Sequence, residues 1–165
     1  MDTEFIDRLA EGENAVRDAA RSFDEDTFNQ VEATFDAVRS EARQAGVTRI
    51  NEGGERVVYH GGSVAGTETV IKIAINGCRQ NEQAVETWNE MGETARECVA
   101  PVIAWSPDRQ WIVQRKASAG RPGTVDSVVD RLAQAGWRMS DLNLENVGYL
   151  DGRPVITDLG LLYRL

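Results

Sequence analysis

The chain has 165 residues, 41% of them hydrophobic and 27% charged, which is enough to bury the core of one domain, or of one small domain with an appendage. Its apolar runs are too short to cross a membrane and its acidic N-terminus does not resemble a secretory signal, so we expect a cytoplasmic protein. The net charge of −9 argues against nonspecific binding of nucleic acid, which requires a basic surface.

Two amphipathic helices are expected in residues 1–46. The first covers residues 2–22, and the second follows the acidic break DEDT and ends at Gly46, a residue that favours helix termination. Apolar residues recur three and four apart in both helices. They are Phe5, Ile6, Leu9, Val16, Ala20 and Phe23, then Phe28, Val31, Phe35, Val38, Ala42 and Ala45. We expect an antiparallel helical hairpin that packs on the domain; the alternative is a partner surface or an oligomer interface.

From Val47 the pattern changes to that of strands. The segment VTRINEGGERVVYHGG predicts a hairpin that turns at Gly53 and Gly54, and ETVIKIAI predicts the next strand. In VIKIA the isoleucines alternate onto one face and Lys72 onto the other. A lysine in the middle of a strand must find an anion or reach water, because an unpaired buried ammonium is unfavourable.

Lys72 and Lys116 are the only lysines, against sixteen arginines. An acidic, lysine-poor composition indicates a salt-loving host, since carboxylates hydrate the surface and ions screen their repulsion. A solvated lysine at the end of an edge strand is the alternative interpretation of Lys72.

The next elements are a helix from Gln80 to Ala95 and two strands, VAPVIAW and QWIVQR, around a turn at residues 106–109. These strands complete a five-stranded antiparallel sheet. Thr124 is expected to cap a further helix that Gly136 ends, and Trp137 is expected in the core.

The C-terminal run MSDLNLENVGYLDGRPVITDLG, residues 139–160, contains the strongest turn signal, Asp151-Gly152. Folding the chain there pairs Leu150 with Arg153, Tyr149 with Pro154, Gly148 with Val155 and Val147 with Ile156. Asn146 and Asp158 then lie at the open end of the hairpin.

An amide oxygen and a carboxylate at that open end could share one hard cation, for which Mg²⁺ is the natural candidate. Asp141 lies in the loop that leads into the hairpin, where it could accept a proton from an attacking hydroxyl. A calcium loop starting at Asp141 is excluded, because its sixth position needs Gly and its twelfth Glu, whereas the chain has Asn146 and Gly152 there. A polar surface loop before an ordinary hairpin is the remaining alternative.

This spacing resembles the catalytic segment of the protein kinase-like superfamily, in which H-R-D-L-x-x-x-N is followed by a hairpin and D-F-G. By this resemblance Asp141 is the catalytic base, and Asn146 and Asp158 are the metal ligands. Three positions depart from the pattern. Met139 replaces His, Asn143 stands where protein kinases carry a Lys, and Leu159 replaces Phe.

The resemblance also assigns roles upstream. VIKIA is similar to the V-A-I-K strand, so Lys72 would hold the α and β phosphates of ATP. A helix glutamate, Glu82 or Glu86, would pair with Lys72; Glu86 is the preferred choice.

Two further segments acquire a role only through the resemblance. Gly53 and Gly54 form either a simple turn or a lid over the phosphates, since they match G-x-G-x-x-G poorly. Lys116 opens the segment 116–120, whose backbone would read adenine.

The resemblance covers residues 47–160. It does not extend to the activation segment or to the helical substrate platform of protein kinases. We therefore expect an α+β, protein kinase-like fold: a helical extension (1–46), an N-lobe (47–116) with the sheet and one helix, and a truncated C-lobe (117–165) with the catalytic hairpin.

The implied function is an ATP- and Mg²⁺-dependent phosphotransferase acting on a protein hydroxyl or on itself; a small-molecule acceptor is the less favoured option. The alternative is a nucleotide-binding or inactive pseudokinase that regulates a partner or self-associates through its N-terminal helices. Compact microbial and viral kinase-like proteins tolerate such departures from the pattern. Together with the acidic composition, this suggests a halophilic archaeon or its virus as the source.

Overall fold

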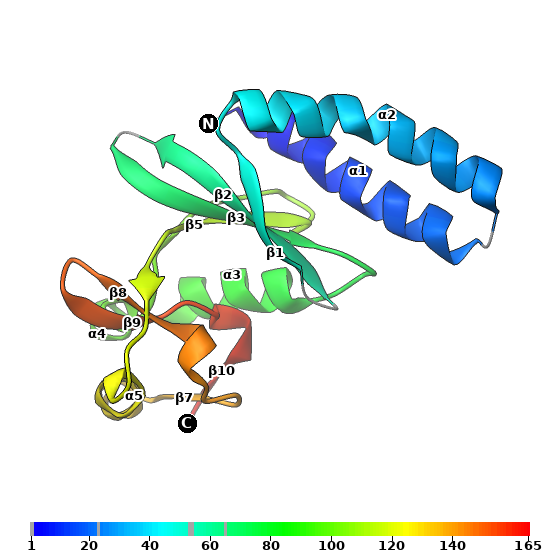
Figure 1. Cartoon of the computed structure of the whole chain (residues 1–165). Helices are drawn as coiled ribbons and strands as arrows, with labels where there is room; N and C mark the ends of the chain where they lie inside the picture. Colours follow the sequence, from blue (N-terminus) through cyan, green and yellow to red (C-terminus); the bar gives the residue numbers. More distant parts are fainter. Residues whose placement is uncertain (1, 23, 53–54, 65) are drawn as a thin grey trace.

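The computed structural model describes residues 2–22, 24–52, 55–64 and 66–165. It has an α+β architecture in which a five-stranded antiparallel sheet lies between an N-terminal helical hairpin and a smaller C-terminal half (Figure 1). Within these ranges, no helix combines the length and the apolar character needed to cross a membrane.

The sheet has the strand order β1-β2-β3-β5-β4, and every neighbouring pair is antiparallel. Its strands are β1 (Thr48–Glu52), β2 (Arg56–Val64), β3 (Thr67–Ala74), β4 (Val102–Trp105) and β5 (Trp111–Arg115). The five predicted strands are therefore confirmed. The predicted turn at Gly53 and Gly54 lies outside the described residues.

The helices α1 (Thr3–Arg21) and α2 (Glu25–Gln44) form the predicted hairpin and cover one face of the sheet (Figure 1). Asp2 and Asp24 cap them, because each carboxylate accepts a backbone N–H two residues later. The hairpin and the sheet share one core. Its buried members include Phe5, Ile6, Leu9, Phe35, Val57, Tyr59, Ile71, Ile73, Ile75, Trp111 and Val113. The prediction that this hairpin packs on the domain is confirmed.

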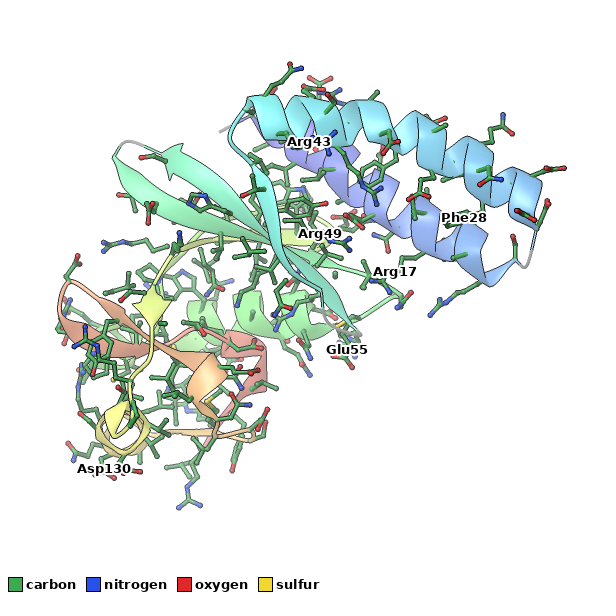
Figure 2. All side chains as sticks on the ribbon, viewed as in Figure 1. Arg17, Phe28, Arg43, Arg49, Glu55 and Asp130 are labelled. Atoms are coloured by element: carbon green, nitrogen blue, oxygen red, sulfur yellow. The ribbon has the colours of Figure 1, made fainter. Side chains whose placement is uncertain are left out.

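A buried polar contact adds to this packing. Glu13 of α1 is 1% exposed and accepts a hydrogen bond from the hydroxyl of Tyr59 on β2. Arg49 of β1 lies between the sheet and the helix (Figure 2), with Nη2 3.6 Å from the Glu13 carboxylate. Burial and the Glu13 carboxylate raise the pKa of Tyr59, so the phenol stays protonated as the donor. The sequence pattern gave no indication of this contact, since Glu13 interrupts the apolar stripe.

The second half of the chain packs on the opposite face of the sheet. Helices α3 (Gln80–Glu90), α4 (Glu93–Arg96) and α5 (Thr124–Gln134) surround two small sheets. One sheet has the order β6-β8-β9, and the other pairs β10 with β7. Their elements are β6 (Ser118–Ala119), β7 (Trp137–Met139), β8 (Val147–Leu150), β9 (Arg153–Ile156) and β10 (Leu162–Arg164), with 3₁₀ turns η1 (Leu144–Asn146) and η2 (Leu159–Leu161).

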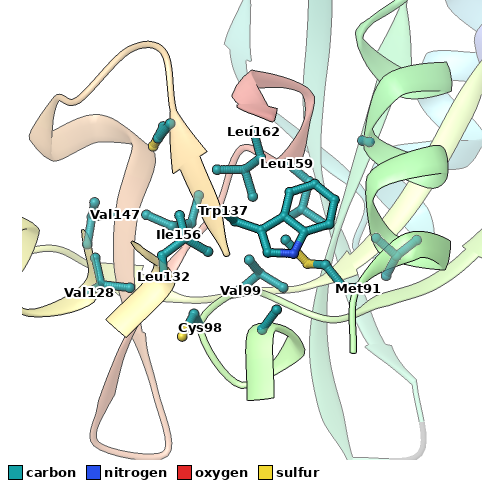
Figure 3. Packing of buried hydrophobic residues seen from close by; sticks show 14 of the residues in the cluster. Met91, Cys98, Val99, Val128, Leu132, Trp137, Val147, Ile156, Leu159 and Leu162 are labelled. Carbon is teal, nitrogen blue, oxygen red and sulfur yellow. The ribbon is translucent and has the colours of Figure 1, made fainter. Parts of the chain in front are cut away.

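A second core joins these elements to α3. Trp137 is 5% exposed, as predicted, and Figure 3 shows it among the buried side chains of this cluster, which include Met91, Val99, Val128, Leu132, Val147, Ile156, Leu159 and Leu162. Two predictions need correction. The helix expected from Gln80 to Ala95 is interrupted at Met91 and Gly92, where the backbone becomes extended. Thr124 is the first residue of α5 and not its cap, because Gly123 with φ 82° takes the cap position.

The predicted register of the C-terminal hairpin is confirmed in all four pairs, from Val147 with Ile156 to Leu150 with Arg153. Asp151 and Gly152 both have positive φ, at 51° and 78°, as a type I′ turn requires. The sequence therefore predicts the local geometry of this hairpin. Its open end faces the large sheet.

Gly12 allows α1 and α2 to approach closely. A Cβ atom at this position would lie 2.0 Å from Cδ2 of Phe35, whose side chain is buried. We expect Gly12→Ala to lower the free energy of unfolding by roughly 1–3 kcal/mol, because overpacking outweighs the ~1 kcal/mol gain in helix propensity. Urea unfolding followed by circular dichroism measures this change.

The control is the same substitution in a Phe35→Leu background, where the smaller side chain leaves room for the methyl group. There Gly12→Ala should be neutral or stabilising. Equal destabilisation in both backgrounds would show that the two positions do not interact.

Candidate functional site

A cavity of about 300 Å³ lies between the large sheet and the open end of the β8–β9 hairpin. It is lined by residues from the two halves of the chain. They are Ile50, Asn51, Arg56, Val58, Val70 and Lys72, then Ala100, Gln114 to Ala119, Glu145 to Val147, Thr157 and Asp158. Its size lies at the lower end of the range of small-ligand pockets, which is roughly 300–1,000 Å³.

Lys72 reaches this cavity because of side-chain alternation along β3. Ile71 and Ile73 face the helical hairpin, so Lys72 faces the other way, as predicted. The residue is 8% exposed, and its Nζ donates a hydrogen bond of 2.6 Å to the backbone carbonyl of Thr157. This bond joins the large sheet to the open end of the β8–β9 hairpin.

Asp158 lies beside that contact and is also buried. Its Oδ2 forms an ion pair with Arg56, the first residue of β2, and its Oδ1 accepts a hydrogen bond of 3.3 Å from the backbone N–H of Gly160. The sequence analysis did not single out Arg56. Strand alternation could have found it, because Arg56 stands two residues before Val58, the register partner of Lys72.

Asn146 and Asp141 form a hydrogen-bonded loop at the same end of the hairpin. The Asn146 amide donates to the backbone carbonyl of Asp141 at 3.2 Å and lies 3.4 Å from its Oδ2. Asn143 braces the loop, since its amide donates to Asp141 Oδ2 at 2.9 Å and its Oδ1 accepts from the Asn146 backbone at 3.1 Å. Asn146 lines the cavity, whereas Asp141 is exposed and lies one hydrogen bond outside it.

The predicted residues Lys72, Asn146 and Asp158 are therefore brought together around one cavity. Lys116 also lines it, with Nζ 3.6 Å from a Glu68 carboxylate oxygen. Both lysines of the chain thus line a single cavity. The predicted phosphate-covering residues Gly53 and Gly54 fall outside the described ranges.

The structure does not bring the predicted helix glutamate to Lys72. Asn81 and Val85, four residues apart on α3, are the residues that face inward, and the Asn81 amide donates to the carbonyl of Lys72 at 3.0 Å. Glu82 and Glu86 each follow one of these by one residue and consequently line a different cavity. Glu82 pairs there with Arg79 at 2.6 Å.

The charges at the site influence each other's ionisation. Burial, with a smaller contribution from the neighbouring Arg56 guanidinium, lowers the pKa of Lys72 to about 7, although Asp158 acts in the opposite direction. Burial alone would raise the pKa of Asp158, but Lys72 and Arg56 outweigh it and hold this pKa below its ordinary value. Asp158 is therefore a stable anion.

The oxygen atoms of Asn146 and Asp158 are of the type that Mg²⁺ prefers. In the described part of the chain, no cluster of three or more His, Cys, Asp or Glu side chains could hold a metal ion. A magnesium ion at this site would therefore need further oxygens from a bound ligand, as is common for this metal. It would also share Asp158 with Arg56.

Comparison of the sequence with protein-family models and with curated proteins gives no match. The interpretation of the site therefore depends on its own geometry and on the motifs in the sequence.

The lowered pKa of Lys72 predicts a pH-dependent stability. Between pH 7 and the ordinary lysine pKa of 10.5 the unfolded chain binds the extra proton, so stability rises with pH across this window. Below pH 7 the ammonium is charged in both states and the burial penalty is complete. We expect Lys72→Met to be more stable than wild type at pH 6 by roughly 1–3 kcal/mol, and this difference to narrow toward pH 10.

Urea unfolding at pH 6, 8 and 10 measures this difference. Lys116→Met serves as the control, because its ammonium is partly exposed. A constant difference between Lys72→Met and wild type at all three pH values would contradict the assignment of a buried, destabilised ammonium.

Proposed function

We propose that this chain is a compact phosphotransferase of the protein kinase-like type, with ATP bound in the cavity between the large sheet and the β8–β9 hairpin. The observation that carries the proposal is the convergence of Lys72, Asn146 and Asp158 on one cavity from segments far apart in the sequence. If residues 139–146 were only a polar surface loop before an ordinary hairpin, Asn146 and Asp158 would not be expected to line the same cavity as the buried Lys72.

Each group has a chemical role in this proposal. Lys72 and the other cations of the cavity bind the phosphate chain. Backbone groups of residues 116–119 lie along the cavity wall, where they can contact a base. The oxygens of Asn146 and Asp158 would hold Mg²⁺, which supplies charge neutralisation at the phosphates when bound.

Asp141 is the group available to orient the acceptor. It is exposed at the mouth of the site and held by Asn143 and Asn146. In the proposed reaction its carboxylate accepts the proton of an attacking hydroxyl as that oxygen bonds to the γ phosphorus. The bond from the γ phosphorus to the bridging oxygen breaks, and ADP leaves. The acceptor is a protein Ser or Thr hydroxyl, on this chain or another.

The alternative function is nucleotide binding without transfer, as in a pseudokinase. Two observations favour it. Asp158 is paired with Arg56, and Lys72 is held by the carbonyl of Thr157 with neither Glu82 nor Glu86 in its surroundings. In this case the nucleotide would stabilise the fold and regulate an interaction.

The two functions are separated by incubating the protein with γ-labelled ATP and Mg²⁺ in molar salt. We expect label on protein with the wild type, and a loss on the order of 100-fold or more in Asp141→Asn, because general-base removal typically has effects of this size. Asp130→Asn is the matched control, since it removes an exposed carboxylate on α5 (Figure 2).

Thermal melting with and without nucleotide completes the experiment. An increase in melting temperature without transfer of label would support the pseudokinase. If nucleotide produced neither label nor a shift in melting at any salt concentration, both functions would be rejected.

A further inference from the structure

Arg56 is the least expected residue of the cavity. Its side chain is 11% exposed and its ion-pair partner Asp158 is 12% exposed. A buried ion pair stabilises a protein only when the remaining donors and acceptors of both groups are satisfied, because desolvation of the two charges is unfavourable. The hydrogen-bond partners of the Arg56 N–H groups therefore indicate whether this ion pair serves the stability of the fold.

One of these donors is unsatisfied. Within the described residues, Nη1 of Arg56 is buried and has no hydrogen-bond partner, while Nη2 is used by Asp158. A buried donor left unpaired destabilises the folded protein. Arg56 lines the cavity, so a small turn of its guanidinium would let a ligand with acceptor oxygens satisfy the unpaired donor.

The charges around the cavity indicate which ligand this would be. Four cationic side chains line it, Arg56, Lys72, Arg115 and Lys116, against the two carboxylates Glu145 and Asp158. The chain as a whole has a net charge of −9, so the lining of the cavity is rich in cations for this protein, although Arg115 and Lys116 also pair with Asp151 and Glu68. A guanidinium fork matches the geometry of a phosphate group, and such pairing is stronger than with neutral acceptors.

We infer that Arg56 is a polyphosphate-binding residue whose ion pair with Asp158 makes binding of the nucleotide independent of divalent cations. The inference rests on the proposed function, because it assigns a nucleoside triphosphate to the same cavity. An unpaired Asp158 would repel the phosphates unless a metal ion neutralised it. Arg56 provides this neutralisation from within the chain and still has an unpaired N–H group to offer to the ligand. Mg²⁺ is then needed for transfer of the phosphoryl group and not for binding.

Isothermal titration of the wild-type protein with ATP, in EDTA and in Mg²⁺ at the same salt concentration, tests the first half of the inference. The dissociation constants in the two buffers should agree within about threefold. Binding that appears only with Mg²⁺ would overturn the inference and leave the proposed function intact. Binding in neither buffer would reject the proposed function itself.

Arg56→Gln tests the second half. In EDTA this variant should bind ATP at least about tenfold more weakly than wild type, because it loses the donor and exposes the phosphates to Asp158. Mg²⁺ should restore most of the affinity, since Asp158 becomes free to take the metal. Arg153→Gln is the matched control, because it removes the same charge from an exposed arginine outside the cavity.

A purely structural role for Arg56 would reduce stability without this metal-dependent pattern. Equal affinities of wild type and Arg56→Gln in EDTA would therefore overturn the inference. If Arg56→Gln does not fold, as judged by thermal melting, Arg56→Lys replaces it. This variant keeps the charge but lacks the second N–H group of the fork, so weaker binding in EDTA is again expected, and unchanged binding would contradict the role of the guanidinium.

Discussion

The alternation of side chains along β2 and β3 determines which residues enter the core and which line the cavity. Residues of one parity, such as Val57 and Ile73, enter the core shared with the helical hairpin, so their neighbours Arg56 and Lys72 must face the opposite side. A slip of one residue in β2 would turn Arg56 toward the apolar core, and a slip in β3 would do the same to Lys72. The packing of α1 and α2 therefore fixes the register that forms the cavity.

Polar contacts connect the large sheet to the β8–β9 hairpin at the site, whereas the two cores are held together by apolar packing. The bond from Lys72 to Thr157 and the ion pair of Arg56 with Asp158 both connect the large sheet to the end of the hairpin. Each leaves charge buried near the cavity, at a cost in stability. Such an arrangement is characteristic of binding sites, where polar groups are retained for a ligand and not for the fold.

Lys72, Asn146 and Asp158, which match the kinase-like pattern, line one cavity, but the surroundings of the lysine and the aspartate differ from those that the pattern implies. The helix glutamates lie at another cavity because Asn81 and Val85 take the inward positions of α3. An arginine from β2 faces the aspartate instead. The carboxylate of Asp158 is thus neutralised by a residue of the chain itself.

Three local features could be predicted from the sequence: the register of the β8–β9 hairpin, its turn at Asp151 and Gly152, and the face on which Lys72 lies. They follow from turn chemistry and from the period of two, which act over a few residues. The pairing of Arg56 with Asp158, 102 residues away, and the burial of Glu13 against Tyr59 became visible only in the folded structure. Such contacts depend on how separate elements pack, and no local pattern in the chain encodes which charged side chains will meet when water is excluded.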